Sequence, residues 1–282
     1  MPFDPVVRPA RLTDYAALAN LLETGSNVHR HLDWRPALEW LGHDPFWVIE
    51  ENTKILAALA CPPDPPGVAW IRLFAVLPGV ELRQAWQSLF EHILEYFRGW
   101  LEIKIAVIAI YPWFANLIKQ MDFHLHQEIV ILEWENVLPP YIACPPSVKI
   151  RRFDMADLPE VTAVDNRAFD PLWQNSFKSL GMALKQSAYA TLAEVNGEIV
   201  GYQICTAGGY SAHLARLAVL PKIQKHSIGY LLVQDLLKYF SSQNVFRVTV
   251  NTQENNYASL GLYRKMGFWL TGDQFDVYLY NI

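Results

Sequence analysis

The sequence predicts two tandem units of an α/β or α+β fold, each a mixed, mostly antiparallel sheet flanked by helices. Three observations lead to this prediction: strand and helix patterns are interleaved, their order repeats after about 140 residues, and a proline-rich segment separates the copies. The length of 282 residues suits one large domain or two ordinary ones.

Four pairs of segments carry the repeat. They occur in the same order in both copies, at separations of 143 to 145 residues, which indicates duplication of one unit. The pairs are Arg8 with Asp14 and Arg151 with Asp157, the strand–turn–strand patterns that begin at Trp47 and Thr191, the Ala-Val-Leu-Pro segments that end at Pro78 and Pro221, and the segments that begin at Leu117 and Leu262.

A linker is expected between the copies. Residues 138–146 contain four prolines, and clustered prolines cannot continue a helix or a central strand. The expected domains are therefore residues 1–137 and residues 147–282.

The elements of the second copy are set by local signals. Asn196 marks the turn of a hairpin, Pro221 ends a strand, and Gly267 stops a helix. Six strands are predicted near residues 147–152, 189–195, 198–207, 211–220, 245–250 and 274–280. Four helices are predicted near residues 157–166, 172–186, 228–241 and 256–265.

Composition indicates a folded protein without a nucleic-acid partner. Apolar residues make up 52% of the chain and charged residues 18%, which suits a buried core. A net charge of −5 argues against nucleic-acid binding, which needs a basic face. Residues 1–140 carry 10 basic and 17 acidic residues, whereas residues 141–282 carry 13 and 11. A polyanionic ligand is therefore expected to prefer the second copy.

Other features indicate a cytoplasmic protein without membrane attachment. Cys61, Cys144 and Cys205 form neither a disulfide framework nor a zinc-binding spacing, so reduced thiols and no metal are expected. The N-terminal Met-Pro-Phe-Asp lacks the features of a signal peptide. The longest apolar runs, such as residues 105–110, are shorter than the ~18 residues of a membrane span.

A polar turn between a strand and a helix is a candidate anion site. After Pro221, residues 224–229 supply consecutive backbone N–H groups at a helix start, where four donors lack intrahelical partners and the helix dipole is positive. Lys225 and His226 lie beside these groups, and Gly229 lacks a Cβ, so a phosphate can approach closely. The alternative is an ordinary connection whose glycine permits tight packing.

This turn resembles a family signature. Val219-Leu-Pro followed by Gln224-x-x-Ser227-x-Gly229 is similar to the acyl-CoA signature of the GNAT acetyltransferases, Q/R-x-x-G-x-G/A. The resemblance implies that the turn binds the pyrophosphate of an acyl-CoA and that the preceding strand pairs with its pantetheine arm. Ser227 departs from the signature, and a positive φ there would strain it. The implied coenzyme-binding residues are Leu217, Val219, Gln224, Lys225, His226, Ser227, Ile228 and Gly229.

A second segment strengthens the resemblance. Ser259, Leu262, Tyr263 and Met266 lie on one helical face, and the segment beginning at Asn256 resembles the GNAT pattern N-x-x-A/S-x-x-L-Y-x-x-x-G-F. The resemblance implies that Asn256 and Ser259 lie at the coenzyme and that Tyr263 protonates the departing thiolate. By itself, a packing aromatic is the alternative interpretation of Tyr263.

The first copy keeps the frame but loses these chemical groups. Glu81 stands near the expected pyrophosphate, Trp86 opposite Gly229, Ile118 opposite Tyr263, and Asp122 opposite Gly267. We expect a degenerate, non-catalytic copy that contributes to packing or shapes the acceptor cleft. Binding of another ligand is the alternative, along an aromatic stretch that otherwise belongs to the core and consists of Trp34, Trp40, Phe46 and Trp47.

The catalytic base is assigned from position and side-chain type. Many GNAT enzymes carry a glutamate where this chain has Ala215. His213 lies two residues earlier on the same strand face, and its usual pKa suits a base near neutral pH. A structural or surface histidine is the alternative for His213, and Glu194 and Glu254 are alternative bases.

The resemblance also suggests the remaining parts of the site. A backbone N–H of Leu217 or Val219 is expected to stabilise the oxyanion, and Phe169, Trp173 and Phe177 are expected to form the acceptor wall. A small amine, an amino sugar, an antibiotic and a protein N-terminus all remain open as acceptors.

The hypothesis is an N-acyltransferase that moves an acetyl or acyl group from acyl-CoA to a primary amine by direct attack in a ternary complex. A non-catalytic acyl-CoA sensor or scaffold is the alternative, followed by a structural pseudoenzyme. No nucleic acid, membrane or metal is expected, and a monomer or a homodimer is expected.

Overall fold

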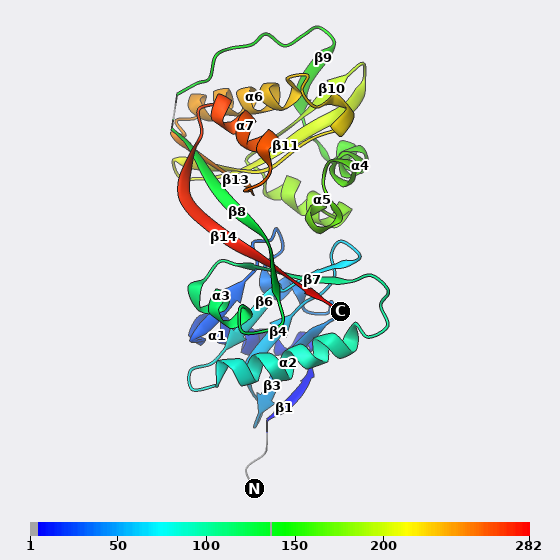
Figure 1. Ribbon diagram of the computed structural model, residues 1–282, viewed down its shortest axis with the longest axis vertical. Coiled ribbons are helices and arrows are strands. Elements are labelled where there is room, and N and C mark those ends of the chain that lie inside the picture. Colours follow the sequence, from blue (N-terminus) through cyan, green and yellow to red (C-terminus); the bar gives the residue numbers. More distant parts are fainter. Residues whose placement is uncertain (1–4, 136) are drawn as a thin grey trace. The chain divides into compact units, whose positions relative to one another are not determined.

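The computed structural model describes residues 5–135 and 137–282, which form two compact units (Figure 1). Unit 1 comprises Met1–His126 and Asp276–Ile282, and unit 2 comprises Gln127–Phe275. Unit 1 contains antiparallel and parallel strand pairs, unit 2 has a mixed sheet, and helices flank the strands of both, which confirms the predicted fold class. Residues 1–4, on which the expected absence of a signal peptide rests, lie outside the described residues.

Unit 1 contains two groups of strands. Its strands are β1 (Val6–Pro9), β2 (Asn27–Arg30), β3 (Phe46–Glu51), β4 (Lys54–Ala60), β5 (Val68–Trp70), β6 (Leu73–Val76), β7 (Lys104–Ala109) and the end of β14 (Trp269–Asn281). Its helices are α1 (Tyr15–Thr24), α2 (Leu82–Tyr96) and α3 (Pro112–Ile118), with 3₁₀ turns η1 (Leu12–Asp14) and η2 (Ala37–Trp40). The first group is antiparallel with the order β1-β3-β4-β6-β2, and the second has the order β5-β7-β14.

Unit 2 has the strand order β14-β8-β13-β12-β11-β10-β9. Its strands are β8 (His124–Glu135), β9 (Val148–Arg152), β10 (Tyr189–Val195), β11 (Glu198–Gly208), β12 (Ser211–Val219), β13 (Arg247–Gln253) and the start of β14. Its helices are α4 (Leu158–Ala168), α5 (Phe177–Gln186), α6 (Ile228–Ser242) and α7 (Tyr257–Lys265), with 3₁₀ turns η3 (Met155–Asp157), η4 (Pro171–Trp173) and η5 (Pro221–Ile223).

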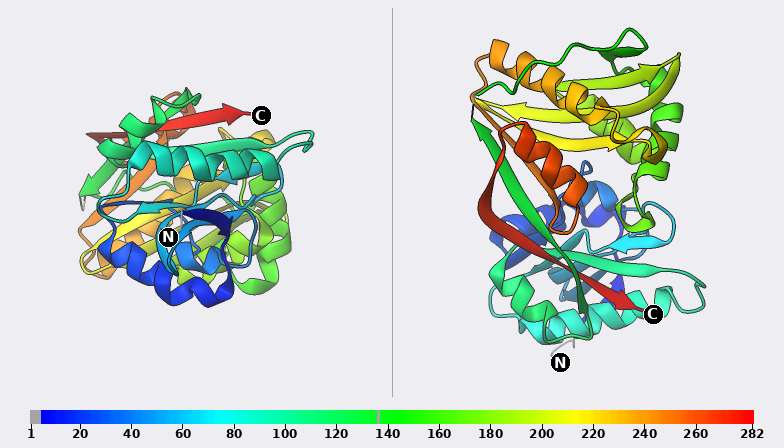
Figure 2. Two further views of the ribbon diagram at one scale, coloured as in Figure 1. Left: turned by 90° about the horizontal axis from the view of Figure 1, so that it is seen from below. Right: turned by 45° about the horizontal axis from the view of Figure 1, so that its top comes forward.

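The predicted elements of the second copy are present, with two differences. The helix predicted over residues 172–186 is divided into η4 and α5, because Ser176 caps a new helix by accepting the N–H of Ser179 at 3.1 Å. The last strand begins earlier than predicted, at Trp269. In α6, Leu232, Leu236 and Phe240 recur every fourth residue and are buried, so this face packs on the sheet. Figure 2 shows α6 and α7 on one face of the sheet of unit 2, and α4 and α5 on the other.

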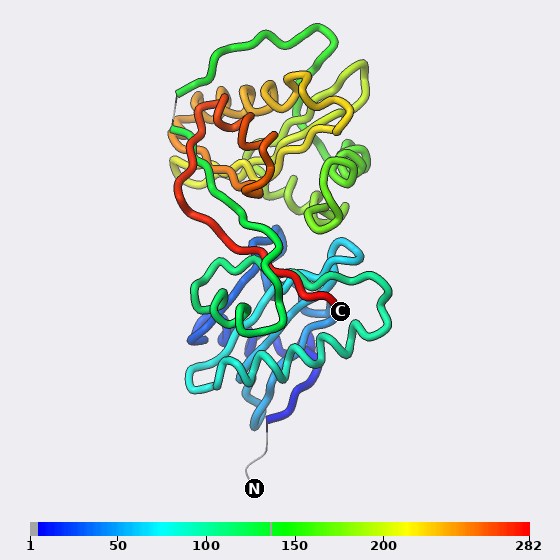
Figure 3. Tube along the Cα trace, in the orientation of Figure 1, coloured from blue at the N-terminus to red at the C-terminus, as the bar shows by residue number. Residues whose placement is uncertain are grey.

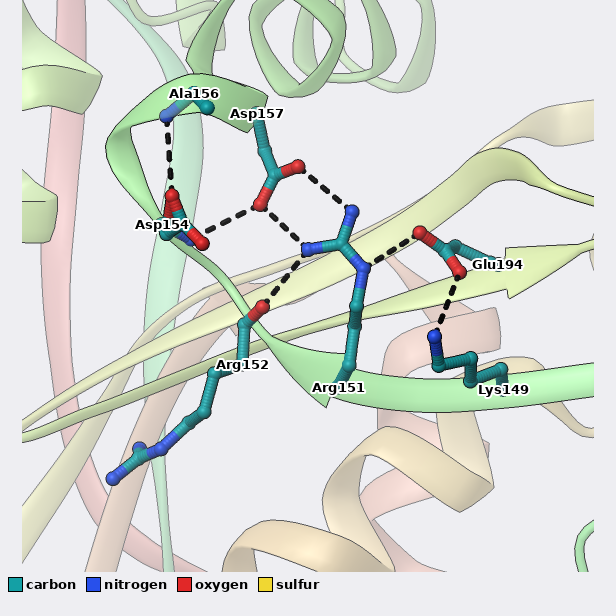
Figure 4. Close-up of polar contacts among 7 residues, drawn as sticks. All are labelled: Lys149, Arg151, Arg152, Asp154, Ala156, Asp157 and Glu194. Carbon is teal, nitrogen blue, oxygen red and sulfur yellow. Dashed lines mark hydrogen bonds and ion pairs between the residues drawn. The ribbon is translucent and has the colours of Figure 1, made fainter.

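An arginine-centred network explains one segment pair of the repeat (Figure 4). Both Nη atoms of Arg151 donate to Asp157 at 2.7 Å, and Nε donates to Glu194 at 2.6 Å, which ties β9 to η3 and β10. The network holds the first strand, the turn after it and the hairpin together. The same contacts recur in unit 1 among Arg8, Asp14 and Glu50.

The sequence copies and the packed units are not the same. Residues 129–135 of β8 end the first copy, yet they pair with β13 in unit 2. Residues 276–281 of β14 end the second copy, yet they pair with β7 in unit 1. The division into 1–137 and 147–282 therefore separates the copies, whereas the units exchange their last strands. Sequence similarity identifies a copy but does not show which sheet takes its last strand.

Residues 137–147 contain no helix or strand and lead from β8 to β9 (Figure 3). The side chain of Gln234 in α6 holds this segment, because its Oε1 accepts from Ile142 N at 2.8 Å and its Nε2 donates to Ile142 O at 3.1 Å. The Tyr230 hydroxyl donates to Pro140 O at 2.6 Å. The proline-rich segment is therefore fixed along α6.

Across the described ranges, no helix has the length and apolar character that crossing a membrane requires.

Candidate functional site

The strands β12 and β13 pair for four residues and then separate. They run parallel from Ser211 opposite Arg247 to Leu214 opposite Val250, where their register ends. Beyond this point β12 continues beside β11, and β13 continues beside β8. The described ladder therefore leaves one edge of β12 unpaired from residue 215 to residue 219.

Backbone alternation decides which groups of β12 face the open edge. The N–H of Leu220 donates to Val200 O in β11 at 2.8 Å. Since the pairing groups of an antiparallel strand alternate, the N–H and C=O groups of Leu217 and Val219 point away from β11. The side-chain amide of Gln224 donates to Val219 O at 3.1 Å, so one of these carbonyls is already paired. Both residues expected to present an N–H to the ligand thus lie at the open edge.

A β-bulge marks the start of the open edge. The partners of Ile204 and Cys205 in β11 are Arg216 and Leu214, so Ala215 between them has no partner in the register. Such an extra residue bends a strand and raises its twist, which contributes to the separation of β12 from β13.

The turn between β12 and α6 forms a concave set of free amides. Lys225 has φ +66° and Ser227 has φ +63°, so left-handed residues alternate with the others. Among the described residues, no acceptor is hydrogen-bonded to the N–H groups of residues 225–230. Backbone of this shape gathers N–H groups into an anion-binding hollow, here at the positive end of the α6 dipole. Ser227 therefore has the strained backbone expected from its departure from the signature.

The side chains of the turn have separate tasks. Lys225 and His226 are exposed, and Nδ1 of His226 lies 2.9 Å from Gln224 O. Ile228 is buried in the core, so only its backbone faces the turn. A Cβ on Gly229 would lie 3.1 Å from Cδ2 of Leu262 in α7. The glycine therefore permits close packing of α6 on α7, the alternative considered from the sequence.

The start of α7 is capped by Asn256. Its Oδ1 accepts the N–H of Ser259 at 3.1 Å, and its Nδ2 donates to Gln253 Oε1 at 3.4 Å. Both residues implied as coenzyme contacts therefore also fix the start of the helix that carries Tyr263.

Tyr263 lies between α7 and the sheet at the point where the strands separate. It is 4% exposed and belongs to the same apolar cluster as Leu214 and Val250, the last paired residues of β12 and β13. Burial raises the pKa of its hydroxyl above the usual value, and the nearby Cys205 adds to this effect. The phenol therefore remains protonated at neutral pH and has a proton to donate.

His213 lies on the other face of the sheet. Its Nδ1 is 2.9 Å from the Thr249 hydroxyl on β13. Burial lowers the pKa of His213, and hydrogen bonds with Asn251 and Thr249 oppose this effect. The imidazole is therefore neutral at pH 7, as a general base must be.

The two alternative bases have different surroundings. Glu194 is engaged with Arg151 in the network of Figure 4, which gives it a structural task. Glu254 is exposed after the end of β13, and its N–H donates to Glu128 O at 2.9 Å.

Sequence reasoning missed a buried ion pair behind the open edge. Arg216 in β12 bonds to Asp165 in α4, with Nε–Oδ2 at 2.8 Å, and to Trp173 O at 2.6 Å. Asp165 is fully buried. The available signal was a charged residue beside Val164 on the apolar face of the predicted helix. The expected acceptor wall lies here: Arg216 stacks on the Phe169 ring at 3.5 Å, whereas Phe177 is exposed.

In unit 1 the corresponding edge is covered. β6 pairs with β4 as β12 pairs with β11, so Phe74 and Val76 correspond to Leu217 and Val219. The strand β2 lies antiparallel along β6, with residue 29 opposite Phe74 and residue 27 opposite Val76. The backbone edge that is open in unit 2 is thus paired with the chain itself in unit 1.

The helix start of unit 1 is also occupied. Glu81 caps α2, and its carboxylate accepts the N–H groups of Arg83, at 3.1 Å, and of Gln84. The placement of Trp86 opposite Gly229 was wrong. α2 begins at Leu82 and α6 at Ile228, because the connection after the proline is three residues shorter in unit 1. Trp86 therefore corresponds to Leu232, and both are fully buried.

Comparison with known proteins assigns a family to part of the second copy. Residues 152–268 match the acetyltransferase (GNAT) family. The chain carries a GNAT acetyltransferase domain. Over 120 residues, 42% of the chain, it is 27% identical to an uncharacterized N-acetyltransferase of Methanocaldococcus jannaschii, of which 76% is covered. The matched residues lie within unit 2.

Solved structures extend the likeness to the whole chain. A tandem GNAT protein from the clavulanic acid biosynthesis pathway has a TM-score of 0.66 and 18% identity, with 98% of each chain covered. A GCN5-related N-acetyltransferase from Sphaerobacter thermophilus has a TM-score of 0.63 and 16% identity, with 99% of this chain and 96% of that chain covered. The first copy, which lies outside the family match, therefore shares the fold of these solved structures.

Proposed function

We propose that unit 2 transfers an acyl group from acyl-CoA to a primary amine, by direct attack within a ternary complex. The observation that carries this proposal is the meeting of two unpaired backbone surfaces, the free amides of residues 225–230 and the open edge of β12. One suits a diphosphate and the other suits an extended amide chain, and acyl-CoA carries both groups.

Each surface has a defined binding task. The amides after Gln224 hold the pyrophosphate, and Lys225 supplies a mobile positive charge at its side. The C=O of Leu217 and one of the two N–H groups of Leu217 and Val219 pair with the pantetheine amides, which leaves the other N–H for the acyl oxygen. Bound acyl-CoA supplies a thioester, whose acyl carbon is open to attack by an amine.

The remaining groups manage charge during transfer. His213 takes a proton from the amine as its nitrogen bonds to the acyl carbon, and Tyr263 gives a proton to the sulfur as the carbon–sulfur bond breaks. The N–H of Leu217 or Val219 stabilises the negative charge on the acyl oxygen. The products are an amide and free CoA thiol, and protons return through solvent.

Unit 1 is proposed to be a non-catalytic copy. Its β2 covers the edge that corresponds to the open edge of β12, and Glu81 occupies the amides at the start of α2. Ile118 stands at the position of Tyr263 and is fully buried, so no phenol is available there.

A thiol-release assay tests the activity. The full chain is mixed with acetyl-CoA and each of four amines: phenethylamine, spermidine, glucosamine and a peptide with a free N-terminus. Release of CoA thiol above the rate without amine supports the transferase. Acetyl-CoA binding by calorimetry without thiol release from any of the amines would favour the sensor, and no binding would favour a structural role.

A pair of variants tests the binding surface. Ser227→Glu places a carboxylate at the start of α6, as Glu81 does in unit 1, and should weaken acetyl-CoA binding by about tenfold or more through charge repulsion. Ser227→Gln has nearly the same size without the charge and is the matched control. Equal affinities of the two variants would show that phosphate does not bind at this turn.

A further inference from the structure

The side chain of Arg216 links β12, which carries the open edge, to α4 and to the segment after α4. Its backbone lies between the bulge residue Ala215 and Leu217, which presents groups to the open edge. Its side chain, 14% exposed, leaves on the face toward α4. There Nε and Nη2 contact Asp165 Oδ2 at 2.8 and 2.7 Å, and Nη2 donates to Trp173 O at 2.6 Å.

Asp165 extends these contacts to further elements. Its Oδ1 accepts the N–H of Asn175 at 2.8 Å, and its Oδ2 accepts the Tyr202 hydroxyl from β11. The side chain of Gln174 closes the segment by donating to Phe169 O at 3.0 Å and to Asn166 O at 2.9 Å. The segment after α4 is thereby tied to β11 and β12 through one buried carboxylate.

The geometry suits arginine in particular. A guanidinium presents several donors in one plane and stacks on aromatic rings, whereas an ammonium does neither. The Arg216 guanidinium lies over the Phe169 ring at 3.5 Å while it holds Asp165 and the carbonyl of Trp173. The side chain therefore fixes both the ring of Phe169 and the backbone of η4 relative to β12.

We propose that Arg216 is a positioning residue for the amine acceptor. The acceptor wall is defined here as Phe169, Trp173 and Phe177. Arg216 holds Phe169 and Trp173 of this wall at a fixed place relative to the edge that presents the thioester. This inference rests on the proposed function of unit 2. It assigns Arg216 no contact with the reacting atoms.

The chain offers a matched control. Arg151 makes a comparable network, with Asp157 and Glu194, also in unit 2. It ties β9 to β10 and contacts neither β12 nor the acceptor wall. Arg151→Lys therefore weakens an arginine–carboxylate network without the positioning effect.

The experiment compares Arg216→Lys with Arg151→Lys in the full chain. Acetyl-CoA affinity is measured by calorimetry, and KM and kcat are measured with whichever of the four amines the wild type acetylates fastest. Arg216→Lys should raise KM for the amine about tenfold or more, because small displacements of a positioning group reduce productive binding, while acetyl-CoA affinity changes less than about twofold. Arg151→Lys should change neither. A double variant, Asp165→Asn with Arg216→Gln, removes both charges and leaves no unpaired carboxylate if the single variant folds poorly.

Hydrogen exchange gives a readout that needs no acceptor. The amides of residues 169–177 should exchange about tenfold faster in Arg216→Lys than in the wild type, and no faster in Arg151→Lys. Any of three results would overturn the inference. These are unchanged exchange of residues 169–177 in Arg216→Lys, equal increases of the amine KM and the acetyl-CoA Kd, and the same changes in Arg151→Lys. If the wild type acetylates none of the four amines, the proposed function is contradicted instead. In that case, unchanged exchange of residues 169–177 in Arg216→Lys would separately overturn the positioning role of Arg216.

Discussion

Ser227 adopts a left-handed backbone conformation at the point where α6 begins. For residues with a Cβ this conformation costs roughly 1–2 kcal/mol, and glycine adopts it without that cost. The Ser227 side chain does not offset the cost, since it makes no capping hydrogen bond. The strain fits a turn whose amides are shaped for a ligand rather than for the helix.

Ser227→Gly should therefore stabilise the chain by about 0.5–1 kcal/mol, the relief of strain less the larger backbone entropy of glycine in the unfolded chain. Urea unfolding of the two proteins measures this difference. Ser227→Ala keeps a Cβ and is the control that should show no gain. A stabilisation by alanine equal to that by glycine would mean that the positive φ is not the cause.

Tyr263 combines burial with a hydroxyl that retains its proton at neutral pH. If this hydroxyl protonates the departing thiolate, Tyr263→Phe removes the donor but keeps the ring. kcat should fall by roughly 10²–10⁴-fold, while the Kd for acetyl-CoA stays nearly unchanged. Leu262→Ala on the same helix face is a control that disturbs packing without removing a proton donor. Equal losses of kcat in both variants would assign Tyr263 to packing.

At the scale of elements, the strand β2 is the feature that distinguishes unit 1 from unit 2. It carries His29 into the core, where the ring stacks on Phe114 with centroids 4.0 Å apart and Nε2 lies 3.2 Å from Ile71 O. Within the described ranges, Nδ1 has no hydrogen-bond partner. Burial lowers the pKa of His29 to about 3. The strand that covers the β6 edge is thus held by a neutral imidazole.

This burial makes unit 1 sensitive to acid. The folded pKa of about 3 lies below the unfolded value of 6.5, so the unfolded chain binds more protons between these values and stability falls as pH decreases from 6.5. At pH 5 the loss from His29 reaches about 2 kcal/mol, from 1.5 pH units at ~1.4 kcal/mol each. Urea unfolding at pH 7.5 and pH 5 measures the loss, which should be smaller in His29→Gln. His43→Gln, at an exposed position, is the control, and parallel losses in wild type and His29→Gln would contradict the assignment.

The sequence signals that succeeded were local, and those that failed were long-range. The polar turn before α6, the apolar face of α7 and the hairpin at Asn196 depend on neighbours within one or two turns of chain, so their patterns predicted them. β2 has only four residues, too few for an alternating pattern. The pairing of Arg216 with Asp165 spans 51 residues and has no local signature. Trp86 was misplaced because the sequence does not show where α2 begins. Without that start, the shorter connection before α2 cannot be located.

At the scale of the whole molecule, duplication has produced two units that depend on each other's sequence copy. Trp134 lies near the end of the first copy, yet it is fully buried in the apolar cluster of unit 2 that contains Tyr263. Tyr278 lies near the end of the second copy, yet it packs in the core of unit 1. The covered edge of β6 therefore does not make the first copy dispensable, because that copy supplies a strand to the sheet that carries the candidate site.

The same division predicts how many coenzymes the molecule binds. One acetyl-CoA per chain is expected, because the edge of β12 is open while β2 covers the edge of β6. Calorimetry should give a stoichiometry of one, and Ser227→Glu should weaken that site and leave no second one. Glu81→Gln should not create a second site, since uncapping α2 leaves β2 in place along β6. Two equivalents in the wild type would mean that the covered edge of unit 1 opens to the coenzyme. Neither the pairing of β2 nor the buried ring of His29 is compatible with that opening unless the strand leaves the sheet.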